Sequence, residues 1–177
     1  AESFFRYNNS DVYFANRVFV VEGKGDIAAL KLAGKQLNIN FDLQGFSILG
    51  LSGVENFKYP LALLKELNIP FTLIVDKDFF YPYLNIEKEK SRDSNGFFKY
   101  GPEMKKGASE LVKSLVKDKG ERNMVLKKFH ASHQRHAKVL EKSNIIVMRF
   151  NLEMDLIKTE KGRDFLYVKF KIPKDKR

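Results

Sequence analysis

Five acidic side chains stand where they could hold a divalent metal ion. They follow or open predicted secondary-structure elements in a chain of 177 residues, and they are Glu22, Asp26, Asp76, Asp78 and Glu153. Carboxylates that are brought together repel one another and resist ionisation unless cations neutralise them. Oxygen ligands suit Mg²⁺ or Mn²⁺ better than Zn²⁺, and the chain contains no cysteine. The residues therefore predict a Mg²⁺ or Mn²⁺ site, if the fold gathers them.

The segments that precede these residues have the pattern of buried parallel strands. Continuous apolar runs of strand length alternate with helical spacing, the strands at residues 17–22, 46–51, 71–75 and 144–150 and the helices at 27–37 and 54–67. Strands that alternate with helices predict an α/β fold, a parallel sheet with flanking helices on both faces. In such a sheet, groups at the carboxyl ends of the strands meet in one crevice.

Asp76 and Asp78 come directly after the third predicted strand. Alternate residues of a strand share a face, so we expect both carboxylates on one side, where they can grip one ion or bridge two. In isolation, an Asp-x-Asp in a loop is more often solvated turn chemistry, and Glu-Gly after a strand is often a tight turn. The order and placement of the two motifs therefore carry the inference.

Residues 82–142 interrupt the βα pattern, and we interpret them as a helical insertion. Residues 82–101 are polar and turn-rich, while 102–142 have helical periodicity broken near Lys119. Residues 98–142 hold 12 basic and 5 acidic side chains, residues 158–177 hold 8 and 3, and the whole chain carries +10. This excess favours a polyanion partner whose phosphates the two segments would follow, although Lys-rich solvated helices are a common alternative.

Two short motifs resemble the Toprim domain shared by topoisomerases, primases and several nucleases: VVEGKGD at 20–26 and IVDKD at 74–78. The wider segments 13–30 and 50–78 are similar to the overcoming lysogenization defect (OLD) family, which includes the Gabija nuclease. The resemblance implies a Rossmann-like Toprim nuclease domain over 1–177, with the insertion at about 82–142. It implies a DNA endonuclease or nickase that uses two Mg²⁺ or Mn²⁺ ions, with a role in anti-phage defence.

The resemblance also assigns roles to residues. The first acidic motif of the family falls on Glu22 and Asp26, and its Asp-x-Asp falls on Asp76 and Asp78. Glu22, Asp76 and Asp78 are thereby expected to be catalytic, with Glu22 able to take the proton from water. The residues expected to bind metal are Glu22, Asp26, Asp76, Asp78 and Glu153.

The downstream motif of the family, Asp-Leu-Glu, falls on Asn151-Leu152-Glu153, so Asn151 supplies an amide oxygen but no charge, and Asp155 could serve in its place. A lysine that the family uses after this motif falls somewhere in 158–177 or beyond.

The resemblance further implies a longer protein, with an N-terminal ABC-type ATPase domain through which it forms homo-oligomers. The chain starts with Ala-Glu-Ser, which fits a piece of such a protein. No apolar run approaches the roughly 18 to 20 residues that span a bilayer. The lack of cysteine favours a reducing, cytoplasmic location.

Two alternatives remain open at this point. A small Toprim ribonuclease that matures ribosomal RNA is similar in its first motif, but its second usually runs Asp-x-Asp-x-x-Gly, and here Tyr81 takes the glycine position. A catalytically silent nucleic-acid-binding module is the other.

Two further groups of residues have simple interpretations. His130, His133 and His136 are spaced for one surface helix that contacts phosphate or water rather than zinc. The aromatic residues 79–81 are expected to line a crevice or to pack as core rather than to form a base-stacking platform.

Overall fold

The computed structural model describes residues 10–51, 56–149, 159–160 and 163–164. Its centre is a parallel four-stranded sheet of β1 (Arg17–Val21), β2 (Phe46–Gly50), β3 (Phe71–Val75) and β4 (Ile145–Val147). The strand order is β2-β1-β3-β4, so the first strand lies at the centre, beside the third. The predicted α/β fold with a parallel sheet is confirmed.

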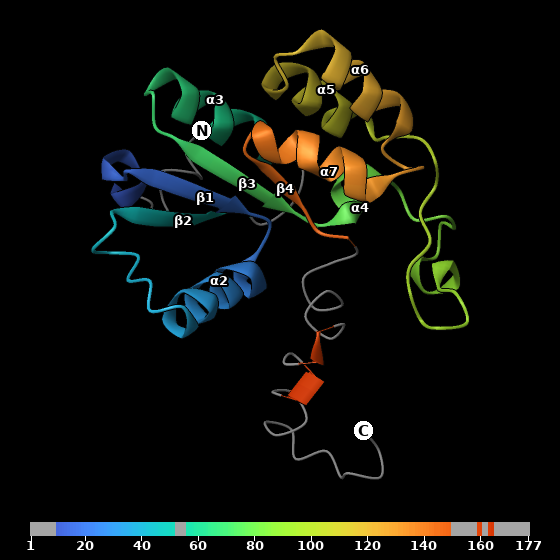
Figure 1. Cartoon of the computed structure of the whole chain (residues 1–177), viewed down its shortest axis with the longest axis horizontal. Helices are drawn as coiled ribbons and strands as arrows, with labels where there is room; N and C mark the ends of the chain where they lie inside the picture. Colours follow the sequence, from blue (N-terminus) through green and yellow to red (C-terminus); the bar gives the residue numbers. More distant parts are fainter. Residues whose placement is uncertain (1–9, 52–55, 150–158, 161–162, 165–177) are drawn as a thin grey trace.

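Helices lie on both sides of the sheet (Figure 1). One side carries α2 (Lys24–Gln36), and the other carries α3 (Lys58–Glu66) and α7 (His133–Lys142), with α5 (Lys106–Leu115) and α6 (Lys119–Lys128) beyond them. A 3-10 turn, η1 (Ser10–Phe14), precedes β1. This arrangement explains the continuous apolar strands, because a parallel sheet covered on both faces has no solvated face to favour alternation.

The two faces of the sheet are packed differently. Val18, Val20 and Leu73 point to the α3 and α7 side and are fully buried. On the α2 side, the rings of Phe19 and Phe46 meet edge to face with centroids 5.5 Å apart and are only half-buried. The main core therefore lies between the sheet and the helices that follow β2 and β3.

The predicted insertion is helical only in its second part. In the structure, α5, α6 and α7 cover residues 106–142, with the break at residues 116–118. Residues 82–105 instead contain one 3-10 turn, η3 (Lys88–Ser91), and two isolated antiparallel bridges, Tyr83 to Tyr100 and Arg92 to Phe98. Residues 82–101 therefore lack helices other than this turn, as their polar, turn-rich sequence indicates, and the predicted helical periodicity of 102–142 corresponds to helices from residue 106 on.

The histidine prediction is wrong as well. The helix α6 ends at Lys128 and α7 begins at His133, so His130 lies in the connection between them. The three histidines therefore do not all lie on one helix. His136 is 2% exposed, and its Nδ1 lies 2.6 Å from the carbonyl oxygen of Ser132. A buried side chain that bonds its own helix start has a structural role rather than a surface one.

The aromatic residues 79–81 are core, as predicted. Phe79, Phe80 and Tyr81 are all at most 3% exposed. Phe80 packs on Phe129 with centroids 5.2 Å apart, which ties the end of β3 to α6. Within the ranges given above, no helix is both long and apolar enough to cross a membrane.

A glycine near the end of α2 tests the packing of this helix against the residues that follow it. A Cβ on Gly34 would lie 2.3 Å from a ring carbon of Phe41 and 3.2 Å from the backbone oxygen of Ile39. We expect Gly34→Ala to lower the free energy of unfolding by about 1–3 kcal/mol, because overpacking outweighs the better helix propensity of alanine. Urea unfolding followed by circular dichroism measures this.

Gly25→Ala in the same helix is the matched control, since a Cβ there meets nothing within 4 Å. It should leave stability unchanged or raise it by up to about 1 kcal/mol. Equal loss in both variants would show that helix geometry, and not the Phe41 contact, sets the effect.

Candidate metal and active site

The ends of β1 and β3 place two of the predicted acidic segments in contact. Glu22 follows β1 directly, and its Oε1 accepts a hydrogen bond of 3.0 Å from the backbone nitrogen of Asp76, the residue after β3. The two strands are parallel neighbours in the sheet. Residues 54 positions apart therefore meet at one edge because of strand pairing alone.

Asp26 lies one helical turn after Glu22, at the start of α2. Its Oδ2 accepts a hydrogen bond of 2.9 Å from the backbone nitrogen of Gly23. A carboxylate at this place also interacts favourably with the positive end of the helix. Asp26 thus stabilises the helix start while its charge remains near Glu22.

Asp76 and Asp78 do not continue the strand. β3 ends at Val75, Asp76 is the N-cap of the short helix α4 (Lys77–Phe80), and Asp78 lies in its first turn. The expectation that both carboxylates lie on one side because they alternate along a strand is therefore wrong, since neither residue is in the strand. The chain turns at Asp76 because the apolar residues 79 and 80 must enter the core beneath the sheet edge.

Asp78 is held from two sides. Its Oδ2 accepts a hydrogen bond of 2.8 Å from the hydroxyl of Tyr83, and its backbone oxygen accepts one of 2.5 Å from Nζ of Lys105. The other carboxylate oxygen, Oδ1, is buried and has no hydrogen-bond partner among the described residues. A buried acceptor without a partner is costly, and it marks a place where a cation or water can bind.

The charges of this region act on Glu22. Burial, together with the charges of Asp78 and Asp26, raises the pKa of Glu22 from 4.5 to about 7, although the hydrogen bond from Asp76 and the charge of Lys105 lower it. Desolvation disfavours the ionised form, and neighbouring carboxylates do the same. The protonation of Glu22 thus depends on the charges of Asp26 and Asp78.

The donor set fits a hard divalent cation. Glu22, Asp26 and Asp78 offer only oxygen atoms, and they repel one another as the sequence predicts. Over the described residues, however, no three His, Asp or Glu side chains are already arranged around a common point that could hold an ion. Binding therefore requires these side chains to turn toward the ion.

The last predicted ligand, Glu153, falls outside the described residues, as do Asn151, Asp155 and the lysines at 158, 161, 169, 171 and 174. Their part in the site stays a prediction.

Sequence reasoning missed two residues that contact Asp78. Tyr83 is in the polar segment after α4, and Lys105 is the N-cap of α5. Neither belongs to a motif, and Lys105 is 27 positions from its partner. The only available signal was the position of Tyr83 close after the Asp-x-Asp.

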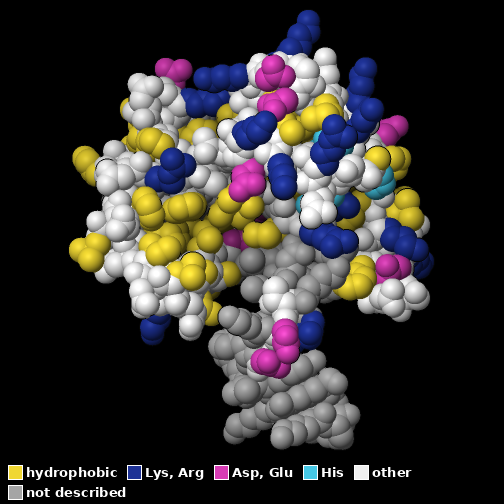
Figure 2. Space-filling view, in the orientation of Figure 1, with side chains coloured by type: hydrophobic (Ala, Val, Ile, Leu, Met, Phe, Trp, Pro, Cys, Tyr) yellow, Lys and Arg dark blue, Asp and Glu magenta, His cyan; other side chains and the backbone are white. Residues whose placement is uncertain are grey.

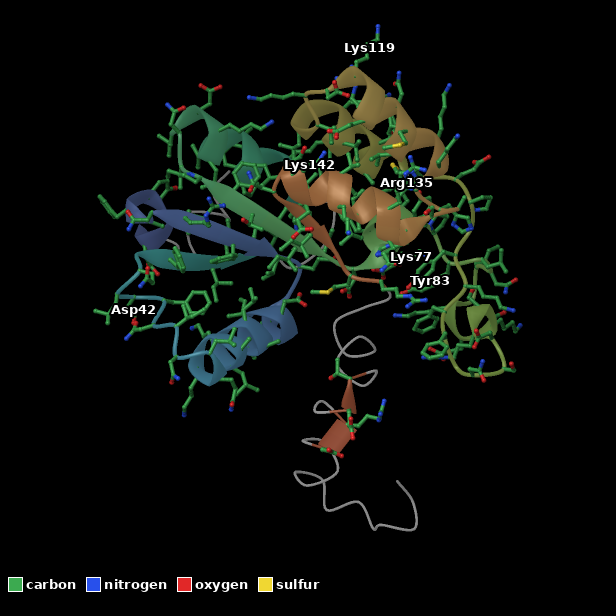
Figure 3. The ribbon with its side chains drawn as sticks, in the orientation of Figure 1. Asp42, Lys77, Tyr83, Lys119, Arg135 and Lys142 are labelled. Carbon is green, nitrogen blue, oxygen red and sulfur yellow. The ribbon has the colours of Figure 1, made fainter. Side chains whose placement is uncertain are left out.

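Apart from Lys77 and Lys105, which lie at this edge, many of the basic side chains lie on the helices farther along the chain. Figure 2 shows Lys and Arg gathered over α5, α6 and α7, while the surface over β1, β2 and α2 is largely apolar. Lys127, Lys128 and Arg135 are exposed, and none of them forms an ion pair within the part of the chain that the structure describes. Lys119 points away from the molecule at the far end of α6 (Figure 3).

Comparison with known proteins agrees with the motifs. Residues 13–78 match the sequence model of the family described as overcoming lysogenization defect protein-like, TOPRIM domain. The chain contains an OLD-like Toprim domain. The segment is 34% identical over 70 residues to an OLD nuclease of Thermus scotoductus, which is 39% of this chain and 13% of that protein.

Two solved structures share the Toprim fold of this chain. The C-terminal region of the Xanthomonas campestris pv. campestris OLD protein matches with a TM-score of 0.51 at 19% identity, over 89% of this chain and 63% of that one. The C-terminal region of the Burkholderia pseudomallei OLD protein matches with a TM-score of 0.52 at 19% identity, over 90% and 75%. The predicted family is confirmed, and the Toprim domain spans only part of its relatives.

The pKa of Glu22 leads to a pH test on the metal-free protein. Because the pKa of Glu22 is raised to about 7, the folded state binds its proton more tightly than the unfolded state does. The stabilising contribution is therefore complete below about pH 4.5 and is lost as pH rises through 7. With a chelator present, we expect Glu22→Gln to gain stability relative to wild type as pH rises from 5 to 8. Urea unfolding at several pH values measures the difference, and a difference independent of pH would contradict the raised pKa.

Proposed function

We propose that this Toprim domain is a divalent-metal-dependent nuclease domain that hydrolyses phosphodiester bonds of DNA, as an endonuclease or nickase. The observation that carries the proposal is that Glu22 and Asp78 interact at the carboxyl edge of the sheet, where one oxygen of Asp78 is buried and has no hydrogen-bond partner among the residues that the structure describes. An OLD nuclease among the relatives supports the reaction class. Metal-assisted hydrolysis needs carboxylate oxygens that can hold an ion beside the phosphate.

The metal ligands that we propose are the oxygens of Glu22, Asp26, Asp76, Asp78 and Glu153, for two Mg²⁺ or Mn²⁺ ions. When bound, such ions supply an activated water and neutralise charge on the leaving oxygen. The carboxylates of the chain set the positions, since oxygen-only ligands select hard cations. Their mutual repulsion in the empty site favours uptake of positive charge.

The chain's own groups have further roles in this proposal. Glu22 has a pKa of about 7 in the metal-free protein, so its carboxylate is suited to accept a proton at neutral pH. Lys105, whose charge acts on Glu22, stands where it can stabilise negative charge on the phosphate. We propose Lys105 for the role for which the sequence had suggested only lysines after residue 157.

We propose that the exposed cations of α6 and α7 bind the phosphates of DNA without reading bases. Such contacts give affinity that depends on salt and not on sequence. They lie on the α6 and α7 surface, away from the carboxylates, so DNA binding does not need the metal. The surface is broad and positively charged, as Figure 2 shows.

In the full-length protein, we propose an N-terminal ABC-type ATPase domain that forms homo-oligomers, with a role in anti-phage defence in the cytoplasm. The support is that solved OLD structures of the same fold are C-terminal regions of larger proteins. The ribonuclease and the silent module remain the alternatives that the experiments below separate from this proposal.

The first test replaces the buried carboxylate. Asp78→Asn keeps the shape of the side chain and an oxygen for the Tyr83 hydroxyl but removes the charge. The domain should therefore fold, while the rate of metal-dependent nicking should fall at least about 100-fold. A fall of this size corresponds to a loss of about 3 kcal/mol of transition-state stabilisation. Supercoiled plasmid with Mg²⁺ or Mn²⁺ is the substrate, and structured RNA is assayed in parallel.

Asp42→Asn is the matched control, an exposed aspartate at the opposite edge of the molecule (Figure 3). It should nick DNA like the wild type. Activity of Asp78→Asn equal to that of wild type would remove Asp78 from the site, and cleavage of RNA alone would favour the ribonuclease.

The second test concerns the basic surface. With a chelator present, the domain should bind duplex DNA, and replacing Lys128 and Arg135 by Gln should reduce the slope of log affinity against log salt by about 1.8, because two phosphate contacts are lost. Lys31→Gln with Lys35→Gln on α2 removes the same charge from the other side of the sheet and should change the slope little. Equal changes in both pairs would mean that net charge, and not this surface, binds DNA.

A further inference from the structure

We propose that Tyr83 is a positioning residue, and that residues 82–101 form a support that holds its hydroxyl against Asp78. This inference rests on the proposed function as a metal-dependent nuclease. The Tyr83 hydroxyl donates a hydrogen bond of 2.8 Å to Oδ2 of Asp78 and leaves Oδ1 as the oxygen without a partner. Tyr83 thereby selects which oxygen of Asp78 remains for an ion.

The hydroxyl is suited to be a permanent donor. A tyrosine hydroxyl is ordinarily protonated at neutral pH, and a neutral donor leaves the negative charge on Asp78 for a cation. A donor of this kind is the usual outer partner of a metal-binding carboxylate.

The ring of Tyr83 is fixed by aromatic neighbours. It stacks on Tyr100 with centroids 5.4 Å apart at 25°, and it contacts Phe98 at 5.0 Å. Nζ of Lys88 lies 5.0 Å from the centre of the ring. Contacts on several sides leave the ring little freedom to rotate, so the hydroxyl has a defined position.

The backbone of residues 82–101 supports the same arrangement. Tyr83 and Tyr100 are paired by an antiparallel bridge, the nitrogen of Leu84 donates to the oxygen of Lys99 at 3.0 Å, and the nitrogen of Gly101 donates to the oxygen of Pro82 at 2.9 Å. These bonds close the segment at its base, beside α4. The segment is therefore ordered where it meets Asp78 even though it has no regular helix or long strand.

Two of the four basic side chains of the segment are paired with its own carboxylates. Lys90 pairs with Glu87 at 2.7 Å, and Arg92 pairs with Glu89 at 2.6 Å. Cations that neighbouring carboxylates neutralise add little to phosphate binding. A support for Tyr83 is the role that these contacts leave for the segment.

Lys105 completes the support from the side of α5. Its side chain holds the backbone oxygen of Asp78, and its backbone nitrogen donates to the oxygen of Phe80 at 2.7 Å. In Figure 3, Tyr83 and Lys77 lie together at the carboxyl edge of the sheet, on the side of the residues that follow β3. Asp78 is thus fixed by its main chain and by one carboxylate oxygen.

The experiment compares Tyr83→Phe with wild type in the chain of 177 residues. The variant keeps the ring and its packing and loses only the hydroxyl. We expect the dissociation constant for Mn²⁺, measured by calorimetry without DNA, to rise about tenfold, as for other outer partners of metal ligands. The Mn²⁺ concentration for half-maximal nicking should rise by a similar factor, while the rate at saturating Mn²⁺ changes less.

Tyr59→Phe is the control, because Tyr59 is 46% exposed on α3. It should bind Mn²⁺ like the wild type. The double variant Tyr83→Phe with Asp78→Asn should bind Mn²⁺ no more weakly than Asp78→Asn alone, because Tyr83 acts through Asp78.

The outcomes separate this inference from the proposed function. If wild type binds Mn²⁺ and nicks DNA while Tyr83→Phe has unchanged Mn²⁺ affinity, the positioning role is overturned and the nuclease stands. A loss of stability in Tyr83→Phe with unchanged Mn²⁺ affinity has the same meaning. If wild type neither binds Mn²⁺ nor nicks DNA, both proposals are overturned.

Discussion

The partial burial and the mutual repulsion of carboxylates at one edge of the sheet are the constraint on which the candidate site depends. Pairing of β1 with β3 forces Glu22 toward Asp76 and Asp78, and the start of α2 adds Asp26. Together, burial and these charges raise the pKa of Glu22. A backbone N–H, the Tyr83 hydroxyl and Lys105 offset part of the cost, and a cation would offset more.

This constraint explains where the lysines are. Cations beside the carboxylates would neutralise them and compete with a metal ion, and Lys105 is the described lysine whose charge acts on Glu22. The basic excess lies instead on the helices of the 98–142 segment. The exposed basic surface of these helices is thus separate from the carboxylate site, so the proposed binding of phosphates and the proposed binding of metal use different parts of the domain.

The segment between α4 and α5 shows how an irregular region serves a rigid site. Tyr83 stacks on Tyr100, two ion pairs link charged side chains of the segment, and backbone hydrogen bonds close its base. Order here comes from side-chain contacts rather than from a helix or sheet. A polar, turn-rich sequence can therefore hold a hydroxyl in place as well as a regular element can.

The positions of Glu22, Asp76 and Asp78 were predictable because the period and length of apolar runs mark strand ends, and parallel strands end at the same edge. The contact of Tyr83 with Asp78 was not predictable, because it depends on how an irregular chain turns after α4. The same holds for Lys105, whose partner is 27 positions away.

By itself, the sequence determined the α/β class, the parallel sheet and the residues at the ends of β1 and β3, since these follow from local patterns of apolar side chains. Only the tertiary structure decided that Asp78 lies in a helical turn and that His130 is not on the helix of the other two histidines. It also decided that Oδ1 of Asp78 has no hydrogen-bond partner among the described residues. These features depend on which side chains from distant segments pack against each other, and the local pattern of residue types does not predict such contacts.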